Sequence, residues 1–341
     1  MSRVVDGGPG DGPVACATLG VVIPCRNEVG TIAHVLDALA AQERRPDEVV
    51  VVDDGSTDGT GAVVERWSSR EPILKVRVLA NLAHGATGIP AAVNAGIRVL
   101  TTDVIARLDG HCLPAPDYLR RLIGLAVRPE VGVSGGAWVI VPGASTSVAR
   151  AVALAAGHPF GSGGAAYRHP GETGPFDTDT VPFGCFRRQV WESVGGYDES
   201  LGANEDYEFN WRVRRSGQRV VLDPSACCTY FARATLSSLA RQYFRYGHWK
   251  ATMLRRHPSS VRPRQIAPAA LIVVLVGAAA LALLLADARW LLPVAGYAAA
   301  VGLAGLLTRG GRLLMAAALA VMHLSWGLGF WVSMARSLGG R

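Results

Sequence analysis

The last quarter of the chain is almost continuously apolar, and this feature constrains the fold more than any other. Three apolar segments, Ala267–Ala286, Trp290–Leu307 and Leu313–Ala335, are each close to the roughly 20 residues that a helix needs to cross a bilayer. They contribute to a hydrophobic fraction of 50% and a mean hydropathy of +0.24, which are high for a water-soluble protein. The sequence therefore predicts three transmembrane helices within residues 266–336.

Arginines flank these segments unevenly, and their distribution predicts an orientation. One side would carry Arg255, Arg256, Arg262, Arg264, Arg309 and Arg312, and the other side Arg289, Arg336 and Arg341. Because loops rich in Lys and Arg stay in the cytoplasm, we expect a multi-pass protein of the plasma membrane, the inner membrane of a bacterium. Its globular part would be cytoplasmic and its carboxyl terminus would lie outside.

The rest of the chain divides by composition into three parts. Residues 1–18 are rich in Gly and Pro and are expected to be disordered, residues 19–232 form a globular domain, and residues 233–265 form an amphipathic interfacial helix followed by a basic linker. A net charge of +7 could suggest nucleic acid, but the arginines gather beside the apolar tail. Anionic lipid is the better partner, and we expect no nucleic acid.

Short apolar runs alternate with segments of helical periodicity in the globular part. The expected strands are Leu19–Pro24, Glu48–Val52, Lys75–Leu79, Val104–Leu108 and Val131–Val141, with helices over Ile32–Leu39, up to Ser68 and over Ile89–Leu100. This order predicts an α/β fold with a mostly parallel sheet and helices on both faces. Residues 143–182 are small and Gly-rich, and we interpret them as an irregular flap.

Carboxylates, not Gly-rich phosphate loops, follow two of these strands. Asp53 and Asp54 follow the second strand, and Asp109 and His111 follow the fourth. Ligands bind beyond the carboxyl ends of parallel strands, where an Asp can accept the N–H of a base and an Asp and a His can hold Mg²⁺ or Mn²⁺. The alternatives are an Asx turn at Asp53 and a solvated turn at Asp109.

Four segments in this order resemble the nucleotide-binding half of a family 2 glycosyltransferase with the GT-A fold. They are VVIPCRNE, VVVVDDGSTDGT, IPAAVNAGI and LDGHCLP, and the D-x-H form resembles the succinoglycan-type sugar transferases of bacterial polysaccharide assembly. The resemblance covers roughly residues 19 to 250. It implies a nucleotide-sugar donor pocket that includes Pro24, Glu28, Asp53 and Asp54. Most members have D-x-D, and a His at position 111 favours Mn²⁺ over Mg²⁺ because imidazole is the softer ligand.

Two later motifs complete the implied site. Glu205 and Asp206 open a helix with Asn204 at its N-cap, where the macrodipole stabilises acidic residues in any protein. The resemblance implies that this pair is catalytic and that Asp206 is the general base. Gln242, Arg245 and Tyr246 resemble the Q-x-x-R-W motif with Tyr in place of Trp, which implies that Arg245 grips the diphosphate and Tyr246 stacks on the acceptor.

These observations predict an inverting, metal-dependent glycosyltransferase in the synthesis of extracellular polysaccharide or cell-envelope glycan. The donor would be a nucleotide sugar, with UDP-sugar favoured, and the acceptor a hydroxyl of a lipid-linked, polyprenyl-type glycan. One alternative is a polyprenyl-phosphate sugar transferase, whose phosphate acceptor scarcely needs a base. The other is a catalytically silent membrane scaffold that binds nucleotide sugars.

Overall fold

The structure is a computed structural model that describes residues 17–80, 88–310 and 312–339. The chain forms two compact units: the first comprises residues up to 139 and 169–230, and the second comprises residues 140–168 and 231–341. The sequence predicts disorder for residues 1–18. Of these, residues 1–16 lie outside the described ones.

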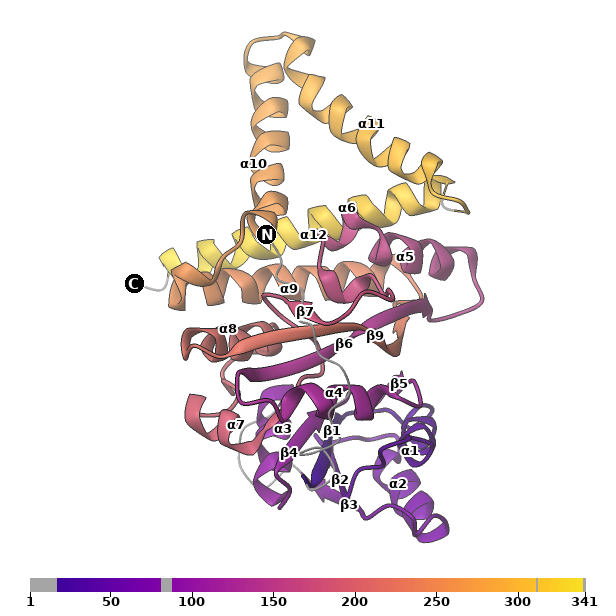
Figure 1. Cartoon of the computed structure of the whole chain (residues 1–341). Coiled ribbons are helices and arrows are strands. Elements are labelled where there is room, and N and C mark those ends of the chain that lie inside the picture. Colours follow the sequence, from indigo (N-terminus) through magenta and orange to yellow (C-terminus); the bar gives the residue numbers. More distant parts are fainter. Residues whose placement is uncertain (1–16, 81–87, 311, 340–341) are drawn as a thin grey trace. The chain divides into compact units, whose positions relative to one another are not determined.

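The first unit is built on a sheet whose first half is parallel (Figure 1). Its strands are β1 (Leu19–Cys25), β2 (Glu48–Asp53), β3 (Val76–Ala80) and β4 (Val104–Arg107), in the spatial order β3-β2-β1-β4. Val21, Val22 and Ile23 of β1 and Val49–Val52 of β2 are fully buried, as expected for a sheet covered on both faces. The predicted α/β class and these strand positions are confirmed.

The second half of the sheet is antiparallel, which the sequence did not predict. β8 pairs with β4 and with β6, and β5 and β7 both pair with β9, all in the antiparallel sense. The strands are β5 (Cys112–Pro114), β6 (Val131–Pro142), β7 (Phe176–Asp177), β8 (Cys185–Arg187) and β9 (Arg219–Ala232). β6 and β9 each run on from the first unit into residues of the second.

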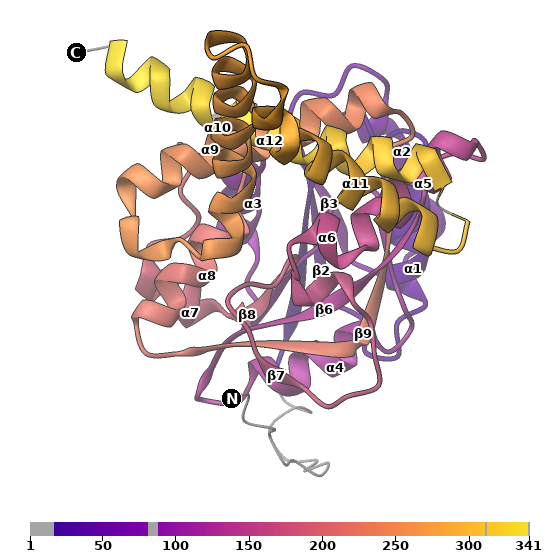
Figure 2. The same ribbon diagram turned by 90° about the horizontal axis from the view of Figure 1, so that it is seen from above.

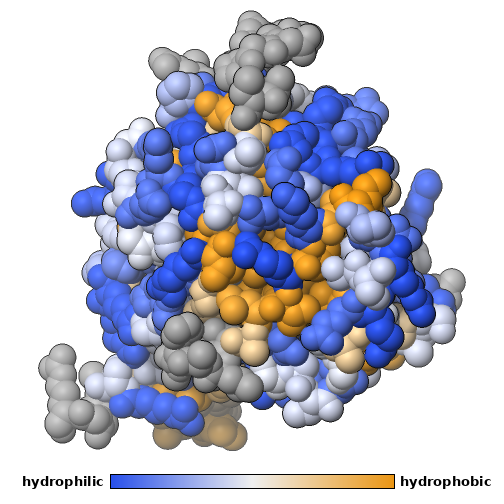
Figure 3. Space-filling model, turned by 90° about the horizontal axis from the view of Figure 1, so that it is seen from below, coloured by the Kyte–Doolittle hydropathy of each residue, from blue (hydrophilic) through white to orange (hydrophobic). Residues whose placement is uncertain are grey.

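Six helices accompany this sheet among the described residues of the first unit. They are α1 (Ile32–Ala40), α2 (Thr60–Arg70), α3 (Ile89–Val99), α4 (Tyr118–Ala126), α7 (Arg188–Val194) and α8 (Glu205–Arg215). α3 lies so close to β1 that a Cβ on Gly96 would be 2.3 Å from Cγ2 of Val22. The lower face of this unit shows mostly hydrophilic side chains around a hydrophobic area (Figure 3).

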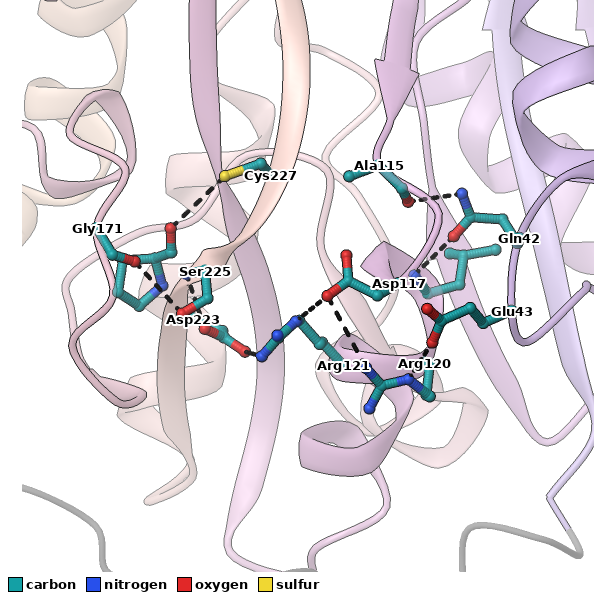
Figure 4. Close-up of polar contacts among 12 residues, drawn as sticks. Gln42, Glu43, Ala115, Asp117, Arg120, Arg121, Gly171, Asp223, Ser225 and Cys227 are labelled. Atoms are coloured by element: carbon teal, nitrogen blue, oxygen red, sulfur yellow. Dashed lines mark hydrogen bonds and ion pairs between the residues drawn. The ribbon is translucent and has the colours of Figure 1, made fainter.

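Polar contacts form a network that links the segment after α1, and also β9, to α4 (Figure 4). Gln42 is only 3% exposed, and its amide donates to the carbonyl of Ala115 (2.8 Å) and accepts from the N–H of Leu119 (3.0 Å). Arg121 on α4 lies 3.8 Å from the carboxylate of Asp223 on β9. Because buried polar groups are costly unless they are paired, this network fixes where α4 begins.

The second unit is helical. It contains α5 (Ser147–Gly157), α6 (Pro159–Ser162), the 3₁₀ turns Ala166–Arg168, Pro258–Ser260 and Ala288–Leu291, α9 (Leu236–Arg256), α10 (Pro263–Leu284), α11 (Leu292–Leu307) and α12 (Arg312–Gly339). Helices long and apolar enough to cross a membrane cover Pro263–Leu284, Ala288–Leu307 and Leu313–Ser337, close to the three segments expected. Figure 2 shows these helices from above.

The expectation of an irregular flap over residues 143–182 is wrong for part of that range. Thr146 caps α5 by accepting the N–H of Ala149 (3.1 Å), and the helix buries its alanines against leucines and methionines of the same unit. Small residues provide little hydrophobic contrast between helix faces, so the sequence pattern did not reveal this helix.

Candidate functional site

Arg107, the last residue of β4, is surrounded by three carboxylates. Its guanidinium lies 3.0 Å from Asp109, 3.0 Å from Glu205 and 2.5 Å from Asp206, and its side chain is only 2% exposed. We call these four residues the Arg107 cluster. β4 supplies the arginine, the turn after it supplies Asp109, and the first turn of α8 supplies the other two acids. The sequence predicted these acids as site residues, but it did not reveal Arg107.

Burial and crowding change how the Arg107 cluster titrates. Burial raises the pKa of Asp206 to about 7, and the like charges of Glu205 and Asp109 add to the rise, against the opposing effect of Arg107. Burial also disfavours the charged form of Arg107, but its acidic neighbours raise its pKa well above the usual value. Asp206 can therefore exchange a proton near neutral pH while Arg107 stays charged.

The N-cap of α8 differs from expectation. Asn204 occupies that position with a left-handed backbone, φ 66°, and its side chain makes no capping hydrogen bond. The segment before the helix has other contacts: Asn94 of α3 donates to the carbonyl of Tyr197 (2.8 Å), and Arg212 of α8 donates to the carbonyl of Gly196 (2.6 Å). The turn that leads into α8 is thus tied to α3.

His111 is held by Glu28, from the loop after β1. Its Nδ1 lies 2.8 Å from Oε1 of Glu28, whose Oε2 accepts from the hydroxyl of Thr31 (2.7 Å). Gly110 permits this approach, because a Cβ there would be 3.2 Å from Cγ of Glu28. The sequence predicted Glu28 and His111 as site residues without predicting that they touch.

The loops after β1 and β2 are joined by hydrogen bonds. Asn27, at φ 59°, accepts the N–H of Thr57 (2.8 Å), and Glu28 donates its N–H to the hydroxyl of Thr60 (2.8 Å). Asp53 accepts the N–H of Ser56 (2.7 Å), which is the turn role that the sequence left open for it.

Asp54 has a different partner from Asp53. One of its oxygens accepts the N–H of Gly88, just before α3, at 2.8 Å. Pro24 is buried within β1, in register with Val52 of β2. Asp53 is the last residue of β2, and Asp54 follows it.

Aromatic rings border the Arg107 cluster, and the sequence did not predict them. Trp138 of β6 stacks on Tyr230 of β9 with ring centroids 4.2 Å apart, and lies 5.5 Å from Phe183. Phe183 covers Arg107 at 5.9 Å and has a left-handed backbone, φ 50°, a conformation that a phenylalanine adopts only when its surroundings hold it there. Such rings suit the faces of a base or a sugar.

The remaining predicted residues belong to α9 in the second unit. Gln242 donates to the hydroxyl of Tyr246 one turn later (2.9 Å). Arg245 lines a pocket of about 260 Å³ together with Arg233, Ser238, Arg241 and Gln242. Within the described part of the chain none of these three arginines forms an ion pair with a carboxylate. The pocket therefore has the chemistry of an anion site.

The expected metal ligands offer a limited donor set. In the described ranges no three His, Cys, Asp or Glu side chains are grouped as a protein-only metal site requires. Asp109 and His111 nevertheless fit a divalent ion that is held mainly by substrate phosphates, because Mg²⁺-type ions use one or two protein carboxylates in such sites. Because Glu28 contacts Nδ1 of His111, its Nε2 is the ring nitrogen that could serve as a ligand of such an ion.

The sequence is similar to a protein family and to several named proteins. The family model "Glycosyl transferase family 2" matches residues 20–189. Succinoglycan biosynthesis protein ExoA of Rhizobium meliloti (strain 1021) is 32% identical over 330 residues, which cover 91% of this chain and 93% of that protein. Pre-mycofactocin glycosyltransferase of Mycobacterium tuberculosis (strain ATCC 25618 / H37Rv) is 30% identical over 261 residues, 74% of this chain but 50% of that protein.

Among solved structures, the mannosyltransferase PcManGT from Pyrobaculum calidifontis in complex with GDP-Man and Mn²⁺ aligns with a TM-score of 0.55. The alignment covers 94% of this chain and 86% of that one, at 22% sequence identity. At this identity the likeness concerns the fold, and it confirms the GT-A architecture expected from the sequence.

Proposed function

The chain belongs to glycosyl transferase family 2, and from that premise we propose that it transfers a sugar from a nucleoside diphosphate donor to a hydroxyl of a lipid-linked acceptor. The Arg107 cluster carries this proposal, because it holds Asp206 next to a fixed cation at the carboxyl end of a parallel strand. The name of the Rhizobium relative supports a role in polysaccharide synthesis. The apolar helices of the second unit support an acceptor that is presented by a membrane.

In the proposed reaction Asp206 takes the proton of the acceptor hydroxyl. The acceptor oxygen then forms a bond to the anomeric carbon while the bond from that carbon to the diphosphate oxygen breaks, so the configuration inverts and the nucleoside diphosphate leaves. Arg107 orients the carboxylate of Asp206, and the neighbouring acid Glu205 raises its proton affinity. A base of this pKa suits catalysis at neutral pH.

The donor would lie along the ends of β1, β2 and β4. Asp53 and Asp54 would accept N–H groups of the base, a role for which a UDP-sugar is the favoured donor. Asp109 and His111 would hold Mn²⁺ or Mg²⁺, which neutralises the leaving diphosphate when it is bound. In the second unit, the cationic pocket of Arg233, Arg241 and Arg245 would by itself bind the phosphate oxygens of an anionic ligand; the sequence motif implied a phosphate-binding role for Arg245 alone.

The test combines donor binding with turnover in detergent-purified protein. UDP and GDP are titrated calorimetrically with Mn²⁺, with Mg²⁺ and with chelator, and transfer from the matching nucleotide sugars to lipid-linked acceptors is measured. Asp206→Asn is compared with Asp177→Asn, a control on β7 whose carboxylate is 50% exposed and pairs with Arg219. We expect D206N to bind donor like the wild type and to lose about 10²–10⁴-fold in kcat, and D177N to keep both properties.

Two results would replace the proposal. Full transfer by D206N would favour the polyprenyl-phosphate sugar transferase, whose acceptor is already an anion. Failure of both nucleotides to bind under all metal conditions would favour a silent scaffold.

A further inference from the structure

We propose that the membrane domain crosses the bilayer twice, through α10 and α11, and that α12 lies along the membrane surface beside α9, so that the carboxyl-terminal end of α12 is on the same side of the membrane as α9. The inference concerns the second unit alone and does not depend on which sugar is transferred. It differs from the three spans that the sequence indicates, although α12 has the length and hydropathy of a span.

The first observation is the close packing of α12 on α9. A Cβ on Gly247 would lie 1.9 Å from the carbonyl oxygen of Trp326, and one on Gly329 would lie 2.0 Å from that of Phe244. Further along, the hydroxyls of Thr252 and Ser333 are 3.4 Å apart. Leu239, near the start of α9, shares a buried cluster with Met315 of α12, whereas Arg255, near the end of α9, donates to the carbonyl of Ser333 (2.9 Å). The two helices therefore run side by side in the same direction (Figures 1 and 2).

The second observation is the charge that α9 carries. Arg241, Arg245, Lys250, Arg255 and Arg256 all belong to this helix. If α12 crossed the bilayer, α9 would have to enter the hydrocarbon with it and bring these cations to bilayer depth. Cationic side chains within the membrane are costly unless they reach the surface or a water-filled cavity. A position of both helices at the interface avoids that cost.

The third observation is how differently the three apolar helices are covered. Of the apolar residues that could span a membrane, 11% are buried within the protein in α10 and 11% in the segment of α11. The corresponding share in α12 is 44%. Met315, Leu319 and Met322 of α12 pack in a cluster with α5 and α9, while Leu313 and Leu328 are exposed. α12 thus has a protein-facing side and an apolar side, as a helix that lies in the interface does.

The hairpin of α10 and α11 has the features of a complete crossing. At 1.5 Å per residue the 22 residues of α10 extend about 33 Å, enough for the hydrocarbon core. The beginning of α10 rests on α12, where Trp331 donates to the carbonyl of Ala269 (2.8 Å). The far turn carries an ion pair between Asp287 and Arg289 (2.8 Å) and Trp290, 42% exposed, which suit the opposite interface.

The arginine distribution fits two spans better than three. With α12 at the surface, Arg336 joins the side that already carries the other flanking arginines. Only Arg289 is then left on the far side among the arginines that flank the apolar helices. Because positively charged flanks remain in the cytoplasm, the two-span arrangement fits better: it leaves Arg289 as its exception, whereas the three-span arrangement also leaves Arg336.

The first experiment locates two points of the full-length chain in intact bacteria with a membrane-impermeant maleimide. One variant is Ala288→Cys in the far turn, and the other has a cysteine appended after Arg341. We expect the first to be labelled in intact cells and the second only after the membrane is permeabilised. The unsubstituted chain, whose own cysteines would be on the inner side, is the control for background.

Labelling of the appended cysteine in intact cells would overturn the inference in favour of three spans. Absence of labelling at Ala288→Cys in intact cells, with labelling after permeabilisation, would overturn it because the hairpin would not cross. Labelling after permeabilisation also shows that each variant is present in the membrane.

The second experiment tests the α9–α12 contact in native membranes. Thr252→Cys with Ser333→Cys should form a disulfide upon mild oxidation, detected as a linked peptide pair by mass spectrometry. The control pair, Thr252→Cys with Ser325→Cys, places the second thiol two helical turns earlier on α12 and should stay unlinked. No linkage in the first pair, or equal linkage in both, would mean that α12 leaves α9 in the membrane.

Discussion

The residues next to Arg107 in the sequence give no indication of its role. It stands in a buried apolar strand, and its strongest partner, Asp206, is 99 positions away. No local pattern connects the two, because periodicity and turn chemistry describe neighbours along the chain and not residues brought together by the fold. The buried arginine becomes understandable only when the sheet places β4 beside the start of α8.

Removing this cation should destabilise the protein strongly. Arg107→Met would leave three acids crowded without a counter-charge, and breaking a buried ion pair by removing one partner typically costs about 3–5 kcal/mol. Arg77→Met is the control, because Arg77 is 53% exposed in its pair with Glu48 and such pairs contribute up to about 1 kcal/mol. Thermal unfolding in detergent should show a much lower Tm for R107M than for R77M. Equal Tm values would contradict the structural role.

The raised pKa of Asp206 predicts the pH dependence of turnover. A general base works in its deprotonated form, so kcat should rise as pH increases through about 7 and fall below it. The profile is measured in saturating donor and metal, and Asp206→Glu serves as the comparison because it keeps a carboxylate. A wild-type rate that stays constant from pH 5 to 8 would argue against Asp206 as the base.

At the level of elements, much of the first unit could be predicted. β1, β2 and β4 are continuous buried apolar runs, and α1 and α3 have clear helical periodicity, so their positions were confirmed within a few residues. α5 was missed because small residues give its faces little contrast. The ends of β2 and β4 carry the acids that the sequence offered as candidates. The aromatic neighbours on β6 and β9 could not be inferred, since antiparallel pairing over long separations leaves no local signal.

Close packing of α3 on the sheet gives a prediction for this element. Gly96→Ala would place a methyl group 2.3 Å from Val22, and overpacking of this kind typically costs about 1–3 kcal/mol. Gly124 is the matched control: it lies in α4, no atom is within 4 Å of its added Cβ, and alanine favours helices by up to about 1 kcal/mol. Tm should fall for G96A and stay or rise for G124A. The opposite order would mean that α3 packs differently.

For the whole molecule, the division of the chain affects how the membrane part can be removed. Residues 140–168 belong to the second unit although they precede much of the catalytic sequence. A cluster of buried residues joins α5 and α9 to α11 and α12, including Val152, Leu239, Leu319 and Met322. The apolar helices are therefore more than a detachable anchor, because α12 completes the core of this unit.

This organisation predicts that truncation after Arg262 yields an aggregating protein even though it removes every candidate membrane span. Without α12, the apolar faces of α5 and α9 around Val152, Leu239 and Tyr243 would be exposed to water, and an exposed patch of this kind promotes association. Size-exclusion chromatography of residues 1–262 without detergent should show large aggregates, and added detergent should recover smaller species by covering the patch. A monodisperse monomer in buffer without detergent would mean that α5 and α9 are stable without α12. The packing of α12 on these helices would then no longer support its position at the membrane surface.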